Sequence, residues 1–410
     1  MGFPSIIINP KRGSRFWHRH PWLYQNEILR RPEDLAEGTI VVLKDKRGKI
    51  YGTGMYNSRS QIAVRRYSMG VKALNEELIE SRILKAQEYR QSLYNGKMPQ
   101  AYRMVFSESD YLPGLIIDRY ANCLVIQTMT AAFDQRKEIV VEILKKLFSP
   151  ECIIERNDSS GRVGEGLEQK TSILHGKLPD ALVIESHGVK FLLNLLEGQK
   201  TGLFLDQQPI YAQLAPRFKG RTVLDCFCYH GAFGLFAAKH GAKSVESVDA
   251  SAQAIEHARQ NAGLNGVQIN FTTENAFDFL KNKSKQGGKY DLIVLDPPSF
   301  TKNKFNIGDA QRGYKEIHLR ALKMLPVGGL LATYTCSHHI QPKIFMEFLV
   351  DAAADVGCSL RLIETYAQSQ DHPVLPEVPE TEYLRGYLFE ISAKDTPKPH
   401  EMVKTPDSES

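Results

Sequence analysis

The stretch VLDCFCYHGAFG, residues 223–234, has the pattern of a buried strand, a tight loop and the first turn of a helix. Asp225 ends the expected strand, and Gly231 and Gly234 let the backbone pass close to a ligand. The glycine spacing is not G-x-G-x-x-G, which argues against a dinucleotide and its pyrophosphate. The stretch therefore predicts an α/β domain with a ligand site at the carboxyl end of this strand.

A second acidic residue, Asp249, ends the next expected strand, 24 residues after Asp225. A carboxylate at this position can accept hydrogen bonds from both hydroxyls of a ribose. The two acids and the glycine loop together predict a cofactor that contains a nucleoside but no diphosphate. The alternative interpretation is an ordinary α/β domain that binds no ligand.

Strand patterns recur around this core with helical patterns between them. The expected strands are 222–225, 244–249, 268–272, 291–296, 329–335, 359–365 and 384–391. Tyr314, Ile317, Ala321, Leu322 and Leu325 form the apolar stripe of one intervening helix. Seven strands with interleaved helices predict a doubly wound, Rossmann-like sheet in a domain spanning 189–392.

Two further motifs follow strands of this sheet. FTTENAF (271–277) places Asn275 within reach of an adenine amino group and Ala276 beside the ring. LIVLDPPSF (292–300) ends the fourth strand, and its two prolines fix a rigid turn that directs Asp296 into the crevice beyond the strand ends. The chain has no G-x-x-x-x-G-K-[ST] motif, which disfavours a kinase or an ATPase.

The N-terminal segment is strongly basic. Residues 1–73 carry 14 Lys and Arg but 5 Asp and Glu, a net charge of +9 in a chain whose total is +5. This imbalance suggests an anionic partner. Short β patterns at 39–43, 50–55 and 61–67 predict a small β-barrel, which we take as domain 1–73.

RGSRFWHRHPWLYQNEI (12–28), ahead of these strands, interleaves basic and aromatic residues and holds both tryptophans of the chain. Such residues stack on bases and contact phosphates. The candidates for nucleic-acid binding are Lys11, Arg12, Arg15, Trp17, Arg19 and Trp22. The alternative is that the tryptophans belong to the barrel core, beneath a solvated basic face.

The middle of the chain predicts a separate unit. A helix over 74–96, three strands, a helix over 134–147 and a hairpin around His187 and Gly188 indicate a central α+β domain, 74–188, without a catalytic constellation. The polar, proline-containing tail 393–410 is expected to be disordered.

Composition excludes several classes of protein. The six cysteines are too few and too scattered for a disulfide framework. No run of about 18 apolar residues occurs, so we expect no membrane span. The apolar patch near the N-terminus precedes its charges, the reverse of a signal peptide. We therefore expect a cytoplasmic protein with free thiols. Cys336, His338 and His339 lack a second ligand cluster, so no metal is expected.

The motifs that contain Asp225, Asp249, Asn275 and Asp296 resemble those of class I S-adenosylmethionine-dependent methyltransferases. Together with LEGQKTGLFLDQQ (196–208), they resemble the ribosomal RNA large-subunit methyltransferases that modify cytosine C5. That family joins an N-terminal PUA domain, a central α+β domain and a Rossmann-like domain, the order expected here over 1–392. The resemblance implies S-adenosyl-L-methionine as cofactor and large-subunit ribosomal RNA as partner. The oligomeric state stays open between a monomer and a homodimer.

The resemblance also implies roles for individual residues. The set expected to contact the cofactor is Thr201, Phe204, Asp206, Gln207, Asp225, Phe227, Tyr229, Gly231, Asp249, Asn275, Ala276 and Asp296. Two positions depart from the family pattern: Gln208 replaces an arginine found in many relatives, and Asn275 replaces the usual aspartate. An amide can still pair with the adenine edge but adds no charge.

Cys336 carries the expected chemistry. Cytosine C5 is a poor nucleophile, so an enzyme that methylates it first adds a thiolate to C6. It also needs an acid at N3 and a base that removes the C5 proton. In TYTCSHHI (333–340), Cys336 follows the fifth strand and Asp296 follows the neighbouring fourth strand. These residues match the nucleophile and the acid, while the group that takes the C5 proton is not evident.

Three other functions stay open at this point. Guanine-N7 methyltransferases share the Asp-Pro-Pro-x-Phe turn but need no nucleophile, and Ser299 stands where some cytosine-C5 enzymes carry a second cysteine. A non-catalytic RNA-binding assembly factor would keep the fold without binding the cofactor. A small-molecule methyltransferase would have little use for the basic N-terminal domain.

Overall fold

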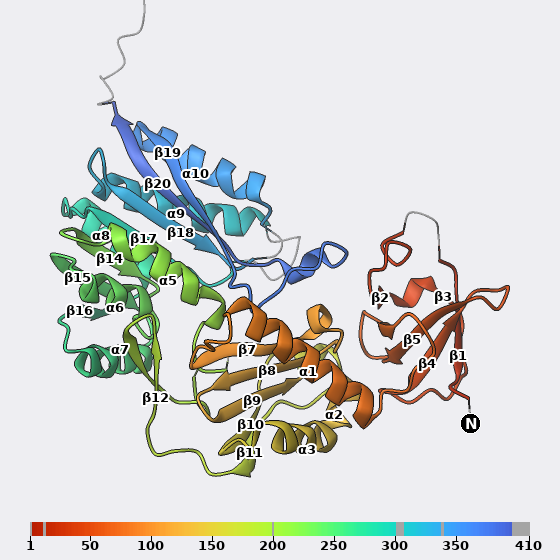
Figure 1. Ribbon diagram of the computed structural model, residues 1–410. Coiled ribbons are helices and arrows are strands. Elements are labelled where there is room, and N and C mark those ends of the chain that lie inside the picture. The colour runs from red at the N-terminus through yellow and green to blue at the C-terminus, as the bar shows by residue number, and fades with distance from the viewer. Residues whose placement is uncertain (1, 11–13, 199–200, 301–306, 338–339, 396–410) are drawn as a thin grey trace, which may run out of the picture. The chain divides into compact units, whose positions relative to one another are not determined.

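The computed structural model describes residues 2–10, 14–198, 201–300, 307–337 and 340–395. The chain forms two compact units, one of Met1–Pro209 with Gln368–Glu382 and one of Ile210–Ala367 with Tyr383–Ser410 (Figure 1). In the part of the chain that is described, no helix is long and apolar enough to cross a membrane. The tail expected to be disordered lies outside the described residues from 396 onward.

The N-terminal domain of the first unit is a curled sheet of short strands. The strands are β1 (Ser5–Ile8), β2 (Trp22–Leu23), β3 (Ile28–Arg30), β4 (Ile40–Lys44), β5 (Ile50–Tyr56) and β6 (Val64–Ser68), in the order β2-β6-β5-β4-β1-β3. Alternate residues such as Ile6, Ile8, Val41 and Leu43 point inward and form a core of their own. The predicted small β domain is confirmed.

The central part of the first unit packs helices on a second sheet. Its strands are β7 (Ala101–Phe106), β8 (Leu115–Tyr120), β9 (Cys123–Thr128), β10 (Cys152–Asn157) and β11 (Lys170–Gly176), in the order β11-β10-β9-β8-β7. Its helices are α1 (Glu76–Leu93), α2 (Ala131–Asp134), α3 (Lys137–Phe148) and α4 (Gly161–Gly164). Strands β12 (Leu182–Ser186) and β13 (Val189–Leu193) form the expected hairpin. The side chain of Asn75 caps α1 by accepting from Leu78 N at 3.1 Å.

The second unit contains the predicted seven-stranded sheet. The strands are β14 (Thr222–Cys226), β15 (Ser244–Asp249), β16 (Asn270–Thr273), β17 (Leu292–Leu295), β18 (Leu330–Thr335), β19 (Cys358–Ala367) and β20 (Arg385–Lys394). Their order is β16-β15-β14-β17-β18-β20-β19, parallel except for β20, which runs antiparallel to both of its neighbours. The order reverses between β14 and β17, and ligands bind at such switch points in open α/β sheets.

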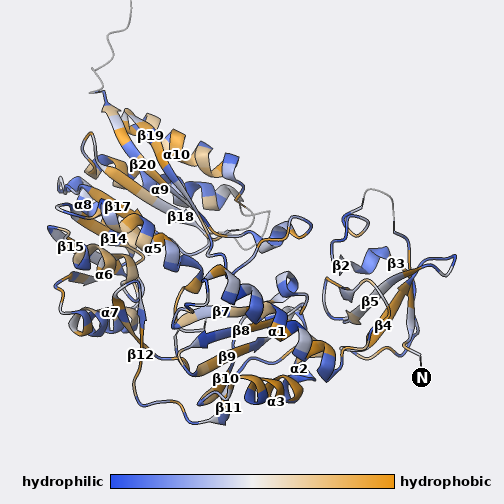
Figure 2. Cartoon of the chain, in the orientation of Figure 1, coloured by the Kyte–Doolittle hydropathy of each residue, from blue (hydrophilic) through white to orange (hydrophobic). Residues whose placement is uncertain are grey.

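Helices flank this sheet and bury its apolar strands. They are α5 (Gln208–Leu214), which begins at the boundary between the two units, α6 (Ala232–Lys239), α7 (Ala252–Asn265), α8 (Ala276–Lys285), α9 (Ile307–Met324) and α10 (Pro342–Val356). Figure 2 shows the hydrophobic colour concentrated on β14, β17 and β18 and on helix faces. Leu224, Ile293 and Leu331 are fully buried in this core. Parallel strands covered on both faces need such apolar runs, so polar side chains are left for the strand ends.

Candidate active site

Asp225 lies in β14 where the strand meets the glycine loop, and its side chain is fully buried. Its Oδ2 accepts a hydrogen bond from Gly234 N at 2.9 Å, and its Oδ1 has no partner among the described residues. Burial, with smaller contributions from the charges of Asp296 and Asp249, raises the pKa of Asp225 to about 8. A buried carboxylate with an unused oxygen is suited to a ligand that brings a positive charge or a donor.

The loop after β14 is held in an unusual backbone conformation. Phe227, Tyr229 and Gly231 have φ angles of 63°, 48° and 78°, in the left-handed region. Gly234 is close to its neighbours, because a Cβ there would meet Ser247 Oγ at 2.5 Å. Non-glycine residues in this region persist only where the surroundings enforce it, and they gather at ligand sites.

Asp249 ends β15 and fixes the same loop. Its Oδ2 accepts from Tyr229 N at 2.9 Å and its Oδ1 accepts from Ser251 N at 2.9 Å. An ionised carboxylate can accept about four hydrogen bonds, so two lone pairs are left for ribose hydroxyls. The half-buried side chain can thus hold the loop and a ribose together.

Asn275 precedes α8 as its N-cap, and its side chain accepts from Phe277 N at 2.9 Å. Asn and Asp are both strong N-caps, which gives a physical reason why the amide replaces the usual aspartate here. The cap uses the amide oxygen, so the amide nitrogen is the group that can donate to an adenine. Ala276 is buried at the first helical position.

Asp296 and Cys336 follow two neighbouring parallel strands. Leu295 of β17 and Thr333 of β18 are paired in register, so both chains leave the sheet at the same edge. Asp296 is half-buried and Cys336 is exposed. Burial raises the pKa of Tyr314 above its usual value, and the charges of Cys336 and Asp296 add to this effect. Tyr314 is a residue of α9.

Tyr314 also supports the loop that carries Cys336. Its hydroxyl donates to Thr335 Oγ1 at 2.8 Å, and Thr335 Oγ1 accepts from Ser337 N at 3.2 Å. All three residues are buried while Cys336 between them faces outward. From the sequence, Tyr314 is predicted only as part of an apolar stripe, since nothing local shows where its hydroxyl points.

The predicted residues at 201–207 belong to the first unit. Thr201 Oγ1 donates to Asp118 Oδ2 at 2.6 Å, and Asp118 also pairs with Arg103 at 2.7 Å. Phe204 is half-buried, whereas Asp206 and Gln207 are buried in a short 3₁₀ turn. A role of these residues in enclosing the cofactor stays a prediction.

Gln208, the second departure from the family pattern, is satisfied within the first unit. Its Oε1 accepts from Ser186 Oγ at 2.7 Å and its Nε2 donates to Ala101 O at 3.0 Å. These neutral contacts explain how an amide occupies the position without leaving a buried polar group unpaired.

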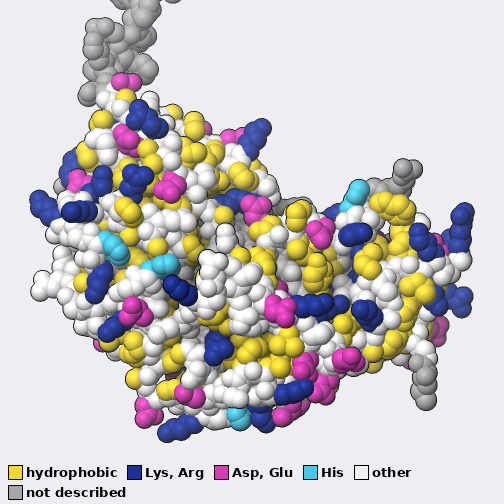
Figure 3. Space-filling model, viewed as in Figure 1, with side chains coloured by type: hydrophobic (Ala, Val, Ile, Leu, Met, Phe, Trp, Pro, Cys, Tyr) yellow, Lys and Arg dark blue, Asp and Glu magenta, His cyan; other side chains and the backbone are white. Residues whose placement is uncertain are grey.

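Two of the residues predicted to bind nucleic acid make side-chain contacts within the first unit. Arg15 pairs with Glu380, and Trp22 Nε1 donates to Glu108 Oε1 at 2.7 Å. Trp17 is 44% exposed and Arg19 is also exposed, whereas Lys11 and Arg12 lie outside the described residues. Figure 3 shows Lys and Arg side chains gathered over this domain on the visible face.

Within the described ranges, no three His, Cys, Asp or Glu side chains gather closely enough to hold a metal ion. His338 and His339, weighed above with Cys336, lie outside those ranges.

The fold and this site define a class of protein. A strand order that reverses beside a buried aspartate, a strained loop and a second aspartate is the arrangement of nucleoside-cofactor enzymes. The family model of S-adenosylmethionine-dependent methyltransferases matches residues 168–390, and a PUA-like domain model matches residues 6–69. The chain belongs to the S-adenosylmethionine-dependent methyltransferase family, and S-adenosyl-L-methionine is its cofactor.

Relatives of the whole chain carry a more specific name. Ribosomal RNA large subunit methyltransferase I of Shewanella amazonensis is 38% identical over 392 residues, which cover 94% of this chain and 99% of that protein. The protein of the same name from Aeromonas hydrophila is 37% identical over 391 residues, 94% of this chain and 98% of that one. A solved structure from Streptococcus mutans, assigned to the SAM-dependent methyltransferases, aligns with a TM-score of 0.80 at 18% identity, over 95% of this chain and all of that one. This last similarity shows the fold alone.

Proposed function

We propose that the protein methylates C5 of a cytosine in large-subunit ribosomal RNA, with Cys336 as nucleophile. The proposal rests on the placement of Cys336 and Asp296 at the ends of paired parallel strands. It is supported by relatives about 38% identical over nearly the whole chain that are named ribosomal RNA large subunit methyltransferase I. This substrate would place the enzyme in the cytoplasm.

The cofactor site suits S-adenosyl-L-methionine, which when bound supplies a methyl group carried on a positively charged sulfur. The unused Oδ1 of Asp225 is the acceptor we assign to the positively charged amino-acid end. Asp249 accepts from the ribose hydroxyls, and Asn275 donates to the adenine through its amide nitrogen. The strained loop at Phe227 and Tyr229 keeps backbone against the ligand.

In the proposed reaction, the Cys336 thiolate adds to C6 of the cytosine while Asp296 donates a hydrogen bond or a proton to N3. The C5–C6 double-bond electrons then become available at C5, which takes the methyl group. Loss of the C5 proton to a base re-forms the double bond and breaks the C6–S bond, so Cys336 returns as a thiolate. Cys336 is an exposed residue, as a nucleophile that meets an RNA base must be.

The test uses purified enzyme, protein-free large-subunit ribosomal RNA and a tritium-labelled methyl donor, followed by digestion to nucleosides. We expect label in 5-methylcytidine. We expect Cys336→Ala to bind S-adenosyl-L-methionine with unchanged affinity but to transfer no methyl above background. Cys358→Ala, which removes another thiol of the same unit, is the matched control and should retain activity.

Each other outcome points to an alternative function. Label in 7-methylguanosine would contradict methylation of cytosine. Full activity of Cys336→Ala would show that Cys336 is not the nucleophile. Wild-type protein that binds no cofactor in a calorimetric titration would instead be a non-catalytic RNA-binding factor.

A further inference from the structure

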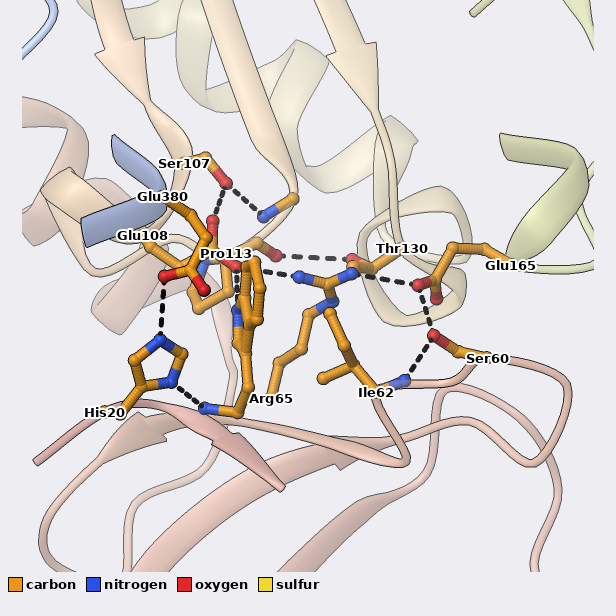
Figure 4. Close-up of polar contacts among 12 residues, drawn as sticks. His20, Ser60, Ile62, Arg65, Ser107, Glu108, Pro113, Thr130, Glu165 and Glu380 are labelled. Atoms are coloured by element: carbon orange, nitrogen blue, oxygen red, sulfur yellow. Dashed lines mark hydrogen bonds and ion pairs between the residues drawn. The ribbon is translucent and has the colours of Figure 1, made fainter. Parts of the chain in front are cut away.

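Two successive arginines of β6 have opposite electrostatic surroundings. Arg65 faces two carboxylates: its Nη1 lies 2.9 Å from Glu108 Oε1 and its Nη2 lies 3.0 Å from Glu165 Oε1 (Figure 4). Its guanidinium also stacks over the ring of Trp22 at 5.2 Å. Arg65 is thus a neutralised cation that joins the N-terminal and central domains of the first unit. Side chains alternate along a strand, so Arg66 points the other way.

Arg66 is buried without a counter-ion. It is 6% exposed, and no carboxylate among the described residues lies within ion-pair distance of it. Its Nη1 donates to Tyr51 O at 3.3 Å and its Nη2 to His20 O at 3.4 Å, both long contacts to neutral oxygens. The ring of Phe16 lies 4.2 Å from the guanidinium carbon. Burying a charge costs much free energy unless an opposite charge accompanies it. The guanidinium of Arg66 therefore lacks the anion that would stabilise it.

Arg66 also lines a pocket of about 130 Å³. We call it the Arg66 pocket; its lining residues include Arg19, Arg66, Met69, Glu108, Tyr111 and Glu377. Burial and the charge of Arg19 lower the pKa of Arg66 to about 10, so the two guanidinium groups repel each other. Clefts that enclose whole small molecules have roughly 300–1,000 Å³, so this pocket fits a phosphate group better than a metabolite.

The other lining residues include two carboxylates, Glu108 and Glu377, and two exposed apolar or aromatic side chains. Glu108 is occupied by Arg65, Trp22 and Ser107, so Glu377 at the half-buried rim is the carboxylate that opposes an anion. Tyr111 and Met69 are each 58% exposed. Tyr111 also has a φ of 59°, a backbone conformation that bulky residues rarely adopt.

We infer that Arg66 and Arg19 bind one backbone phosphate of the RNA in this pocket, with the neighbouring base against Tyr111. The single negative charge of a backbone phosphate would lie between the two cations, and its oxygens would accept the donors of Arg66 that its long carbonyl contacts leave weakly used. That the phosphate belongs to RNA rests on the proposed function.

The experiment measures the affinity of the full-length protein for protein-free large-subunit ribosomal RNA over a range of salt concentrations. Arg66→Gln should weaken binding roughly tenfold, as expected for one lost charge-assisted contact. It should also reduce the slope of log K against log salt by about 0.7. Arg19→Gln should do the same, and the double variant should lose less than the product of the two because both residues hold one phosphate. Tyr111→Ala should weaken binding without changing the slope, and Glu377→Gln should tighten it.

Two controls separate this role from a structural one. Arg47→Gln removes the same charge from an exposed turn of the same domain, outside the pocket. An effect of Arg66→Gln no larger than that of Arg47→Gln would overturn the inference. Because Arg66 lacks a counter-ion, Arg66→Gln should also raise the melting temperature of the RNA-free protein or leave it unchanged. A large fall in melting temperature would show that the guanidinium is needed for folding instead.

The inference and the proposed function can fail independently. RNA binding that depends on Arg66, in a protein that labels no cytosine, would support the pocket and contradict the proposed function. If the protein methylates cytosine but Arg66→Gln binds RNA with wild-type affinity, the proposed function is supported and the role of the pocket is contradicted. If inorganic phosphate raises the melting temperature of wild type but not of Arg66→Gln, while RNA affinity is the same in both, the pocket takes a free anion and the RNA assignment is wrong.

Discussion

Asp225 shows at the scale of one residue how the protein accepts a folding penalty for a ligand site. Burial raises the pKa of its carboxyl from an ordinary 3.8 to about 8. Its ionised form is therefore disfavoured in the folded protein. The stability that this group contributes is fully present below pH 3.8 and is lost as the pH rises towards 8.

Asp225→Asn should therefore stabilise the cofactor-free protein, by an amount that grows between pH 4 and pH 8 and then levels off. One pKa unit corresponds to about 1.4 kcal/mol, so the gain at pH 8 is on the order of a few kcal/mol. The amide oxygen can still accept from Gly234 N. Urea unfolding at pH 5, 7 and 9 measures the difference between variant and wild type.

The same substitution should weaken binding of S-adenosyl-L-methionine, because it removes the charged partner that we propose for the amino group of the cofactor. A stability difference that does not change with pH would show that Asp225 is already ionised in the folded protein. It would contradict the account of the buried carboxylate.

Residue-scale prediction from sequence succeeded where a motif fixes a position on the backbone. Asp225, Asp249 and Asp296 do lie at strand ends, as the pattern of apolar runs requires. The environment of Trp22 could not be predicted, because its indole donates to Glu108, 86 residues away. The lack of a counter-ion at Arg66, next to the neutralised Arg65, likewise depends on segments distant in the sequence.

At the scale of elements, α9 contacts the loop of the proposed nucleophile through one side chain. The hydroxyl of Tyr314 donates to Thr335, whose own hydroxyl holds the backbone of Ser337 beside Cys336. Tyr314→Phe should free this loop at the end of β18. We expect methyl transfer to fall about tenfold, equivalent to about 1.4 kcal/mol in the barrier. Affinity for S-adenosyl-L-methionine should be unchanged.

Tyr290→Phe is the control for Tyr314→Phe, since it removes a hydroxyl that bonds to Glu246 on β15. Both variants lose one side-chain hydrogen bond, worth roughly 0.5–1.5 kcal/mol of stability. Only Tyr314→Phe should slow the reaction when rates are measured at saturating RNA and cofactor. Equal rates in the two variants would contradict a positioning role of Tyr314.

The elements themselves were largely predictable, because apolar periodicity marks buried strands and amphipathic helices. The helix expected around Tyr314 and all seven strands of the large sheet are present. Helix α10 was missed, and the helix expected over 134–147 is α3, which begins three residues later and follows the short separate helix α2. The insertion of β20 between β18 and β19 could not be predicted, since the local pattern of apolar residues does not determine which strands pair.

At the scale of the whole molecule, the two compact units carry different parts of the proposed function. The first contains the basic N-terminal domain and the Arg66 pocket, while the second contains Asp225, Asp249, Asp296 and Cys336. Each predicted domain is one continuous range of residues. The compact units are not continuous, because residues 368–382 join the first unit through contacts such as Arg103 N to Asp371 Oδ2 at 2.9 Å.

The central claim is that Cys336 forms a covalent bond to C6 of a cytosine in the RNA. The most direct measurement incubates the full-length protein with S-adenosyl-L-methionine and large-subunit ribosomal RNA that contains 5-fluorocytidine, followed by denaturation and mass spectrometry. Fluorine at C5 cannot leave as a proton, so the adduct should be trapped. The account predicts one methylated RNA–protein adduct that maps to Cys336 and is absent from Cys336→Ala. An active wild-type enzyme that forms no adduct, or an adduct on another residue, would contradict it.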